Sequence, residues 1–449
     1  MSQPEPPTTA RLEPALIVIA AGVCAALHIG KLPPAITTLG DALGLTLVQA
    51  GFLLSLVQAA GMTLGLAFGA VADGLGLRRS MIVGLCLLAA ASGLGGAATG
   101  VPALMVLRVV EGFGFLLVVL PAPGLVRQLV APQRVNPMLG LWGAYMPFAT
   151  ALALLTGPGW IQALGWRGWW WGLGGVTLAM AWVLARTVPA HASARSAPVS
   201  PLSPVSAAST APKASPASVA SAAVPAVAAV AATGWAARLR QTLTAPGPWL
   251  VAVTFALYSS QWLAVIGFLP AIYTQAGVSG AATAVLTALA AAANMAGNIG
   301  SGRLLQRGVP APRLLAVGFT TMALAAVAAF AGGADAGLPG WLRYAAVLAF
   351  SGVGGLIPAT LITLALRLAP GPGALSTTVG WVQQWSALGQ FAGPPGVAWV
   401  ATRAGGWQWT WVATGSCSLA GLLLTLAIAH LLRRRAHGGP GAGIGLTQA

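Results

Sequence analysis

The sequence predicts an all-α membrane protein of twelve transmembrane helices, arranged as two pseudo-symmetric bundles of six. Three observations predict this fold class: an apolar composition, a regular series of apolar segments, and features that recur in both halves of the chain. Of the 449 residues, 57% are hydrophobic and 6% are charged, whereas soluble domains carry about 25% charged residues. This composition excludes a soluble fold, which could not bury so much apolar surface.

Apolar segments of the right length recur along the whole chain. A membrane-spanning helix needs about 20 mostly apolar residues. The first set occupies residues 14–36, 46–70, 80–99, 103–125, 137–159 and 169–187, and the second set residues 248–274, 280–302, 312–332, 342–366, 375–400 and 408–432. We therefore expect one six-helix bundle over residues 1–187 and another over residues 248–432.

Two segments fall outside these bundles. Residues 188–247 separate them, and most of this segment consists of Ala, Ser, Pro and Val with few charges. Repeated prolines and the lack of a periodic apolar face predict a flexible cytoplasmic linker. Residues 433–449 begin with Arg433-Arg434-Arg435 and continue into a Gly-rich stretch, which predicts a basic cytoplasmic tail.

The placement of basic residues orients the spans. Of the 22 Lys and Arg residues, Lys31 and Arg108 fall within spans and Arg167, Arg343 and Arg403 fall on one side of the membrane. All the others fall on the side of the two termini. Because basic residues accumulate in cytoplasmic loops, we expect both termini to be cytoplasmic. The same rule accounts for the net charge of +16, so this charge does not indicate nucleic-acid binding.

Several features recur in the same order in both halves. The fifth span ends in Gly157-Pro158 and leads to Gly165-Trp166, and the eleventh contains Gly393-Pro394 and leads to Gly406-Trp407. The enrichment of Trp at membrane interfaces explains the tryptophans but not the repeated order. We therefore expect the two halves to be structural repeats.

A short charged loop lies between the second and third spans. It reads Gly69-x-x-x-Asp73-x-x-Gly76-x-Arg78-Arg79, and its charges must face water because charges in hydrocarbon are costly. The loop between the eighth and ninth spans carries a weaker copy, Gly302-Arg303 followed by Arg307, with Gln306 in the place of Asp73. Only the first copy therefore holds an acid.

The first loop resembles the loop between helices 2 and 3 of the major facilitator superfamily of secondary transporters, although Gly74 and Leu77 stand where the family usually has basic residues. A second family pattern, an arginine in helix 4 followed by Gln-Gly-x-Gly, is similar to Arg108-x-x-Glu111-Gly112-x-Gly114, in which an acid replaces the amide. The resemblance extends over the chain apart from its tails and linker. It implies two six-helix halves that move about a midplane site by alternating access, with both loops at a cytoplasmic gate.

Arg108 and Glu111 are the candidate charges of the fourth span. They are three residues apart, so they share a helix face and can pair. Glu111 is the only acidic residue within a predicted span, and ionisable residues inside a membrane usually face a polar interior. Two interpretations stay open: either Glu111 carries protons beside an anion-binding or modulating Arg108, or the pair is structural and fixes helix packing.

Lys31 is the candidate charge of the first span, with His28 one turn earlier. It precedes Pro33-Pro34, which predict a bend or a helix end. Lys31 either captures an anionic substrate or snorkels to the periplasmic surface, and His28 is expected to be a core histidine with satisfied hydrogen bonds. Lys31-Leu32-Pro33-Pro34 and the Arg108 pattern are also loosely similar to the cyanate and nitroimidazole transporter branch.

The second half offers uncharged candidates. The resemblance implies that helices 1, 4, 7 and 10 line the cavity, which favours Gln261 in the seventh span. The other candidates are Asn294 in the eighth span and Gln383 and Gln384 in the eleventh. Amides also hold membrane helices together through hydrogen bonds, so a structural role is the alternative for each.

The resemblance and the charges together predict a proton-coupled secondary transporter of a small anion or organic acid. One alternative is a multidrug or metabolite efflux antiporter, which the half-matched antiporter pattern Ala153-x-x-x-Gly157-Pro158 supports; another is a non-transporting sensor. An enzyme is disfavoured because the sequence has no metal-ligand cluster, nucleotide-binding loop or nucleophile–base pattern. We expect a monomer in a bacterial inner (plasma) membrane, with lipid, a small-molecule substrate and protons as partners. We expect neither cofactor, metal nor nucleic acid.

Overall fold

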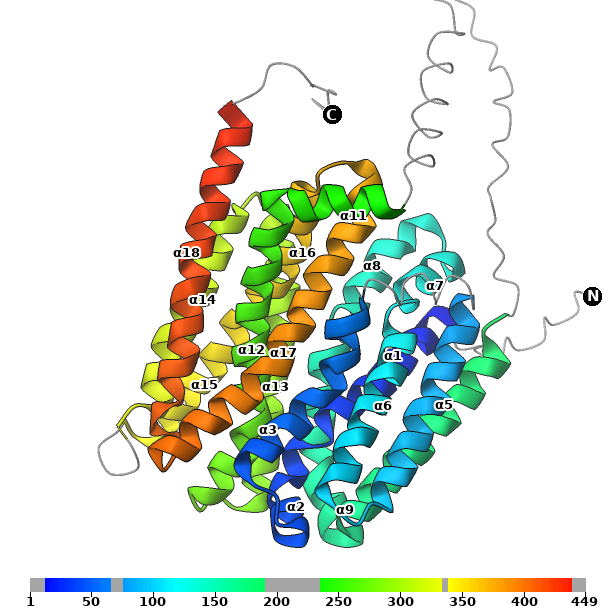
Figure 1. Cartoon of the computed structure of the whole chain (residues 1–449), viewed down its shortest axis with the longest axis vertical. Coiled ribbons are helices and arrows are strands. Elements are labelled where there is room, and N and C mark those ends of the chain that lie inside the picture. The colour runs from blue at the N-terminus through cyan, green and yellow to red at the C-terminus, as the bar shows by residue number, and fades with distance from the viewer. Residues whose placement is uncertain (1–12, 66–75, 190–234, 333–337, 438–449) are drawn as a thin grey trace, which may run out of the picture.

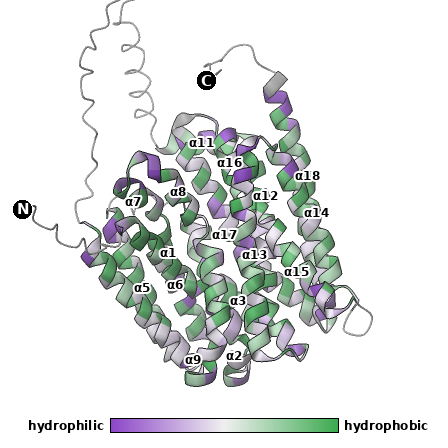
Figure 2. Cartoon of the chain, turned by 180° about the vertical axis from the view of Figure 1, so that it is seen from behind, coloured by the Kyte–Doolittle hydropathy of each residue, from purple (hydrophilic) through white to green (hydrophobic). Residues whose placement is uncertain are grey.

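The computed structural model describes residues 13–65, 76–189, 235–332 and 338–437, and within these ranges every regular element is a helix. Figure 1 shows the helices gathered in two bundles that lie side by side, α1 to α9 in one and α11 to α18 in the other. Apolar residues cover the lengths of the helices, and hydrophilic residues gather near α7, α8 and α11 at one end (Figure 2). The all-helical fold predicted from the sequence is confirmed.

The first bundle contains the helices of the N-terminal half. Its elements are α1 (Pro14–Gly30), η1 (Pro33–Ala35), α2 (Ile36–Leu43), α3 (Leu47–Ser55), η2 (Leu56–Gln58), α5 (Leu77–Gly96), α6 (Val101–Val119), α7 (Ala122–Leu129), α8 (Pro132–Trp142) and α9 (Tyr145–Thr187). The helix that starts at Leu47 continues to Gly65 as one candidate span. Gly69 and Asp73 of the predicted gate loop lie outside the described residues, as does most of the predicted linker.

The second bundle contains the helices of the C-terminal half. Its elements are α11 (Trp235–Thr244), α12 (Pro246–Gln275), α13 (Gly280–Gln306), α14 (Ala311–Phe330), α15 (Gly340–Gly354), α16 (Leu356–Leu368), η3 (Pro372–Ala374), α17 (Leu375–Ala404), η4 (Trp407–Trp409) and α18 (Thr410–His437). In Figure 1, α11 lies across the ends of the longer helices of this bundle.

The described residues of the twelve predicted spans lie mostly on helices, several of which are interrupted. By length and composition, nine helical segments of the described residues can cross a membrane, and the bent pair α8–α9 makes a tenth. The first span is interrupted after Gly30, where Pro33 and Pro34 cannot donate backbone hydrogen bonds to the preceding turn. The tenth span is interrupted at Gly355, between α15 and α16.

The fifth and sixth predicted spans are joined more closely than the sequence suggests. Most of the fifth span and all of the sixth lie in α9, whose 43 residues would extend about 65 Å as one straight helix. The helix is broken at Gly165, where φ is 70° and ψ is 171°, a conformation that glycine adopts without steric cost. The broad connection predicted between residues 159 and 169 is therefore a turn at one glycine. A positive-φ glycine, Gly405, also stands before η4 in the second half.

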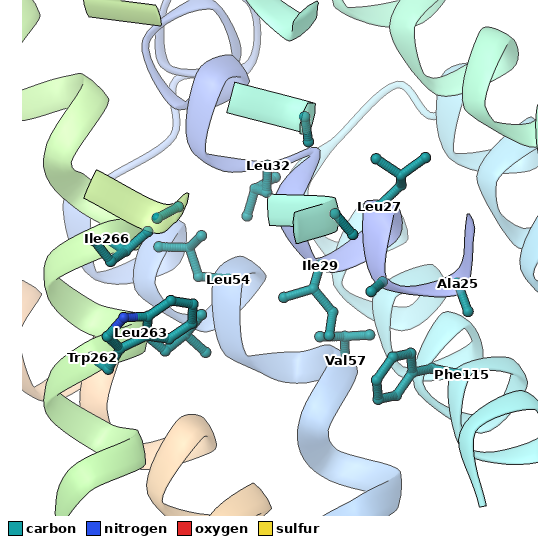
Figure 3. Packing of buried hydrophobic residues seen from close by; sticks show 14 of the residues in the cluster. Ala25, Leu27, Ile29, Leu32, Leu54, Val57, Phe115, Trp262, Leu263 and Ile266 are labelled. Carbon is teal, nitrogen blue, oxygen red and sulfur yellow. The ribbon is translucent and has the colours of Figure 1, made fainter. Parts of the chain in front are cut away.

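Apolar side chains from both halves form a continuous core. Figure 3 shows Ile29 of α1, Leu32 just after this helix and Leu54 of α3 close to Leu263 and Ile266 of α12. All five side chains are buried. Because burial of such side chains contributes about 1.5–3 kcal/mol each, this core favours the arrangement in which the two halves meet.

The helix that starts at Leu47 packs against α17 along the contact between the halves. A Cβ atom added at Gly51 would lie 2.8 Å from Cα of Pro395, closer than real Cβ atoms come. Further along, Gln58 Nε2 donates a 3.0 Å hydrogen bond to Gln390 Oε1. The glycine permits the close backbone approach, and the glutamines satisfy each other in the apolar contact.

Arg78 ties the start of α5 to the end of α9. It follows Gly76, whose φ is 82°. The guanidinium donates to the carbonyl oxygens of Ala185, at 2.6 Å through Nη2, and of Val188, at 2.7 Å through Nε. These carbonyls belong to the last turn of α9, where helices leave such groups without partners. Arg78 therefore closes the end of the sixth span.

We expect Arg78→Ala to destabilise the N-terminal bundle by about 2 kcal/mol, because hydrogen bonds to charged groups contribute about 1.5–3 kcal/mol. Thermal unfolding of the purified protein measures this effect. Arg79→Ala is the matched control, since its side chain is exposed one residue further on. Equal unfolding temperatures for the two variants would contradict the capping role.

Candidate functional site

Four ionisable side chains meet inside the N-terminal bundle. His28 and Lys31 come from the end of α1, and Arg108 and Glu111 come from α6. His28 and Lys31 are 0% exposed and Arg108 and Glu111 are 1% exposed. Charges this deeply buried persist only when they are paired and hydrogen-bonded, so the contacts of each group define what the cluster can do.

Glu111 lies between the two cations. Its Oε2 atom accepts from Arg108 Nη1 at 2.6 Å, which is the pairing that the spacing in α6 predicts. Its Oε1 atom forms an ion pair with Lys31 Nζ. Two cationic side chains thus share one carboxylate, and the cluster carries a net formal charge of +1.

Lys31 directs its ammonium group into the bundle rather than toward a membrane surface. Besides Glu111, Nζ contacts Ser92 Oγ at 3.0 Å and His28 Nδ1 at 3.4 Å. It also lies 4.8 Å from the centre of the Trp170 ring, a distance at which a cation is attracted to an aromatic face. An ammonium group has three donors, so these partners occupy all of them.

Arg108 is less fully satisfied. Its Nε donates to the carbonyl oxygen of Leu53 at 3.0 Å, and its Nη1 donates to that of His28 at 2.6 Å. Its Nη2 is buried and has no hydrogen-bond partner in the described part of the chain. A buried donor without a partner is costly and marks the one place in the cluster where an acceptor can add a bond.

His28 links the cluster to α9. Thr177 Oγ1 donates to the carbonyl oxygen of Leu173 at 2.8 Å, so it accepts from His28 Nε2, which lies 2.8 Å away. This arrangement assigns a proton to Nε2 and leaves Nδ1 to face Lys31. Ser92, Trp170 and Thr177 are the cluster residues that the sequence analysis missed. Their only signal is a polar or aromatic side chain in an apolar span.

The C-terminal bundle holds an uncharged counterpart. Gln261 accepts from Ser418 Oγ at 2.8 Å, which links the first and last spans of this half. His28 and Thr177 link the first and last spans of the other half in the same way. Asn294 Nδ2 donates to Tyr258 Oη at 2.8 Å and to the carbonyl oxygen of Ser351 at 2.9 Å. Gln261 and Asn294 therefore sit within the second bundle, apart from the charged cluster.

The remaining glutamine candidates of α17 lie in different surroundings. Gln384 Nε2 donates to the carbonyl oxygen of Met62 at 2.8 Å, across the contact between the halves. Gln383 is exposed. The structure thus places the predicted substrate and proton residues in a charged cluster in one half, a polar network in the other and an amide between them, and leaves Gln383 apart from all three.

Comparison with known proteins decides the family. The family model described as Major Facilitator Superfamily matches residues 18–394. The chain belongs to the Major Facilitator Superfamily. Membership and fold identify a multi-pass secondary transporter, whose partners are the lipid bilayer and a small-molecule substrate. No curated protein sequence gives a significant match.

Solved structures of other facilitators share the fold. A bacterial homologue of the human lysosomal transporter Spinster, in an inward-facing and unoccupied conformation, matches with a TM-score of 0.65 at 16% identity, covering 96% of both chains. Its inward-facing and occupied conformation matches with a TM-score of 0.65 at 15% identity, covering 94% of this chain and 96% of that chain. At such identities the likeness concerns the fold alone.

The two loops predicted to lie at a cytoplasmic gate are described in part. Gly76 and Arg78 begin α5, and Arg79 is exposed beside them. Gly302 and Arg303 end α13, and Arg307 follows as its C-cap residue; both arginines are exposed. Gly69 and Asp73 lie outside the described residues, so a role for these two residues at a cytoplasmic gate stays a prediction.

Proposed function

We propose that the protein carries a small anion or organic acid across the membrane by alternating access, coupled to protons. The observation that supports this function most directly is the buried cluster of two cations and one carboxylate, in which Arg108 Nη2 has no partner among the described residues. Intramembrane charges of this kind commonly serve substrate or proton movement.

Arg108 is the anion-binding group in this proposal, and Lys31 is a cation whose hydrogen bonds are all made within the cluster. The Lys31 ammonium already has three partners, from Glu111, Ser92 and His28. A carboxylate or phosphate-like oxygen at Arg108 Nη2 would satisfy a buried donor and bring the formal charge of the cluster to zero. Charge-assisted bonds of this type are stronger than neutral ones.

Glu111 is the proton carrier in this proposal, and the charges define the direction of coupling. A proton on Glu111 removes the only carboxylate of the cluster and leaves Lys31 and Arg108 uncompensated, which favours anion binding. An anion that binds at Arg108 in turn favours the protonated form of Glu111, because coupling between two sites is reciprocal. Mutual favouring of this kind produces symport of an anion with a proton.

The membrane arrangement belongs to the same proposal. The distribution of arginines supports cytoplasmic termini in a bacterial inner membrane, with bundles over residues 1–187 and 248–432 and a cytoplasmic linker over 188–247. We also propose that the transporter works as a monomer and that the loops at Arg78 and Arg303 contribute to the cytoplasmic gate.

Gly51→Val is expected to abolish transport while leaving the amount of folded protein unchanged. The side chain would meet backbone atoms of Pro394 and Pro395, at 2.9 and 2.8 Å from the Cβ position, so the two halves could not close there as alternating access requires. Gly65→Ala is the matched control, because its Cβ would lie an ordinary 3.5 Å from Gln384. Substrate flux in proteoliposomes measures both variants, and normal flux in Gly51→Val would contradict the proposed closure.

The direct test is uptake of small organic anions into proteoliposomes, with and without a pH gradient that is acidic outside. We expect the gradient to drive accumulation above equilibrium. Accumulation driven by the opposite gradient would indicate the efflux antiporter. The antiporter pattern at Gly157 has a packing explanation, because a Cβ atom added at this glycine would lie 2.7 Å from Cγ of Pro34. Binding without flux would indicate a sensor.

A further inference from the structure

The second span contains a break that lies between the charged cluster and the other half. Helix α3 precedes the break, the 3₁₀ turn η2 (Leu56–Gln58) forms it, and residues 59–65 are α-helical again. Ser55 Oγ donates to the carbonyl oxygen of Phe52 at 3.2 Å, and such local side-chain bonds compete with regular helix geometry. A 3₁₀ stretch within a longer helix often marks a hinge, so the contacts around η2 show what controls it.

Helix α6 holds this break from the N-terminal half. Arg108 Nε donates to the carbonyl oxygen of Leu53 at 3.0 Å. Leu53 stands in the last turn of α3, where carbonyl oxygens lack partners within the helix. One turn further along α6, a Cβ atom added at Gly112 would lie 2.5 Å from the carbonyl oxygen of Val57, and Figure 3 shows Val57 near Phe115 of the same helix. The helix that carries the cluster charges therefore also contacts η2.

Helix α17 contacts the break from the C-terminal half. Gln58 is 4% exposed, and its Nε2 atom donates to Gln390 Oε1 at 3.0 Å. Gln390 Nε2 lies 3.4 Å from Ser386 Oγ, which shares a 2.7 Å hydrogen bond with Ser259 Oγ of α12. A chain of hydrogen bonds thus runs from the second span through the eleventh to the seventh.

The part of this chain in the C-terminal half is rigid. A Cβ atom at Gly389 would overlap the carbonyl oxygen of Ala256. One at Gly393 would overlap that of Ser260. Helices α17 and α12 are therefore in backbone contact on both sides of Gln390, so this glutamine cannot follow a movement of the second span.

A change of η2 from 3₁₀ to α geometry would break the bond between the halves. A 3₁₀-helix has about 3.0 residues per turn and rises about 2.0 Å per residue, whereas an α-helix has about 3.6 and rises about 1.5 Å. Over the three residues of η2, the change rotates residues 59–65 by about 60° and shifts them by about 1.5 Å. The Gln58–Gln390 hydrogen bond would not survive such a displacement.

We propose that Gln58 is a positioning residue that couples the charged cluster to the C-terminal half through η2. The turn stays 3₁₀ while Arg108 donates to Leu53, and it becomes α-helical when the guanidinium turns toward an anion at Nη2. Gln58 then leaves Gln390, and residues 59–65 separate from α17. The use of this coupling in transport rests on the proposed function, whereas the dependence of η2 on Arg108 does not.

The test measures disulfide formation between Gly65→Cys and Gln384→Cys in full-length protein whose three native cysteines are replaced by serine. A Cβ atom at Gly65 lies 3.5 Å from that of Gln384, within the range of about 3.5–4.5 Å found in disulfides. In Arg108→Lys, which keeps the charge but lacks the Nε donor, the rate of copper-catalysed cross-linking should fall about 10-fold, because a hydrogen bond to a charged group contributes at least this factor. Gln58→Leu should lower the rate less.

The two effects should not multiply. In Arg108→Lys the Gln58–Gln390 bond is already lost, so Arg108→Lys/Gln58→Leu should cross-link as slowly as Arg108→Lys alone. Gly112→Ala displaces the Val57 carbonyl oxygen and should also slow the reaction, which keeps the test decisive if Arg108→Lys is unstable. Thermal unfolding identifies the variants that are folded.

Lys31→Met is the matched control. It removes a cation from the same cluster but leaves the Arg108 bond to Leu53, so its rate should equal that of the parent cysteine pair. The proposal is overturned if Arg108→Lys and Gly112→Ala both leave the rate unchanged, if Lys31→Met lowers it equally, or if the effects of Arg108→Lys and Gln58→Leu multiply. Because the assay contains no anion, a failure to transport anions would refute the proposed function without changing this result.

Discussion

Arg108→Gln is expected to abolish anion-induced thermal stabilisation of the transporter and to reduce flux about 100-fold or more. The substitution removes the buried donor without a described partner, together with the bonds to Glu111, His28 and Leu53. Loss of one partner from a buried, hydrogen-bonded charge pair costs about 2–5 kcal/mol, and about 3 kcal/mol corresponds to a factor of about 100 in affinity. A thermal-shift screen of small organic anions and flux in proteoliposomes measure the two effects.

Lys31→Met is the control that assigns the anion to one cation. It leaves Arg108 paired with Glu111 and leaves Nη2 available, so a weakened but measurable anion response should persist. Arg108→Lys keeps the positive charge beside Glu111, so this variant should fold. It lacks the planar guanidinium group, whose donors contact two backbone carbonyl groups in the wild-type protein. If Lys31→Met loses the anion response while Arg108→Gln keeps it, Lys31 is the binding group and the proposed assignment is wrong.

The fold follows from the sequence because the membrane imposes its own length rule. About 20 apolar residues are needed for each span whatever the packing, and the described residues of the predicted spans lie mostly on helices. The error occurs where a local backbone effect decides the geometry. Gly165 turns the chain within one residue by adopting φ of 70°. This turn does not alter the hydrophobic pattern, so the pattern alone does not locate it, whereas Pro33 and Pro34 are visible in the sequence and predicted the interruption after α1.

The site is less accessible to sequence reasoning, because its contacts join distant segments. The Arg108–Glu111 pair is local in α6 and follows from spacing alone. The contact between Lys31 and Ser92 joins residues 61 positions apart, and that between His28 and Thr177 joins residues 149 positions apart. Helical periodicity gives the face of each residue but not which other helix that face meets. Lys31 could therefore be placed at a surface or in the interior until the rotation of α1 was known.

The two halves divide their chemistry unequally. The first and last spans of each half are linked by a buried hydrogen bond, His28–Thr177 in one and Gln261–Ser418 in the other. Charges accompany only the first of these links. Among the described residues, the buried charged side chains lie in the N-terminal half, which supports the proposal that this half carries the proton and anion chemistry. The C-terminal half then contributes shape and neutral polar groups.

Glu111→Gln is therefore expected to separate transport from its driving force. The amide keeps the size of the side chain but cannot exchange a proton, so the pH gradient should no longer drive accumulation. Exchange of labelled for unlabelled anion across the membrane needs no net proton movement and should persist. Because Lys31 and Arg108 lose their only carboxylate, anion affinity should rise and lose its dependence on pH, whereas wild-type affinity should rise as pH falls.

Ser92→Ala provides the matched comparison for this outcome. It removes a neutral partner of Lys31, the 3.0 Å contact from Nζ, and leaves the carboxylate in place, so gradient-driven accumulation should persist. If Glu111→Gln accumulates anion with the gradient as well as Ser92→Ala does, the carboxylate is a structural counter-ion only. Because no other predicted span contains an acidic residue, the proton would then have to be carried by a group other than a carboxylate within a span. Loss of both exchange and accumulation in a folded Glu111→Gln protein would likewise reduce Glu111 to a structural role.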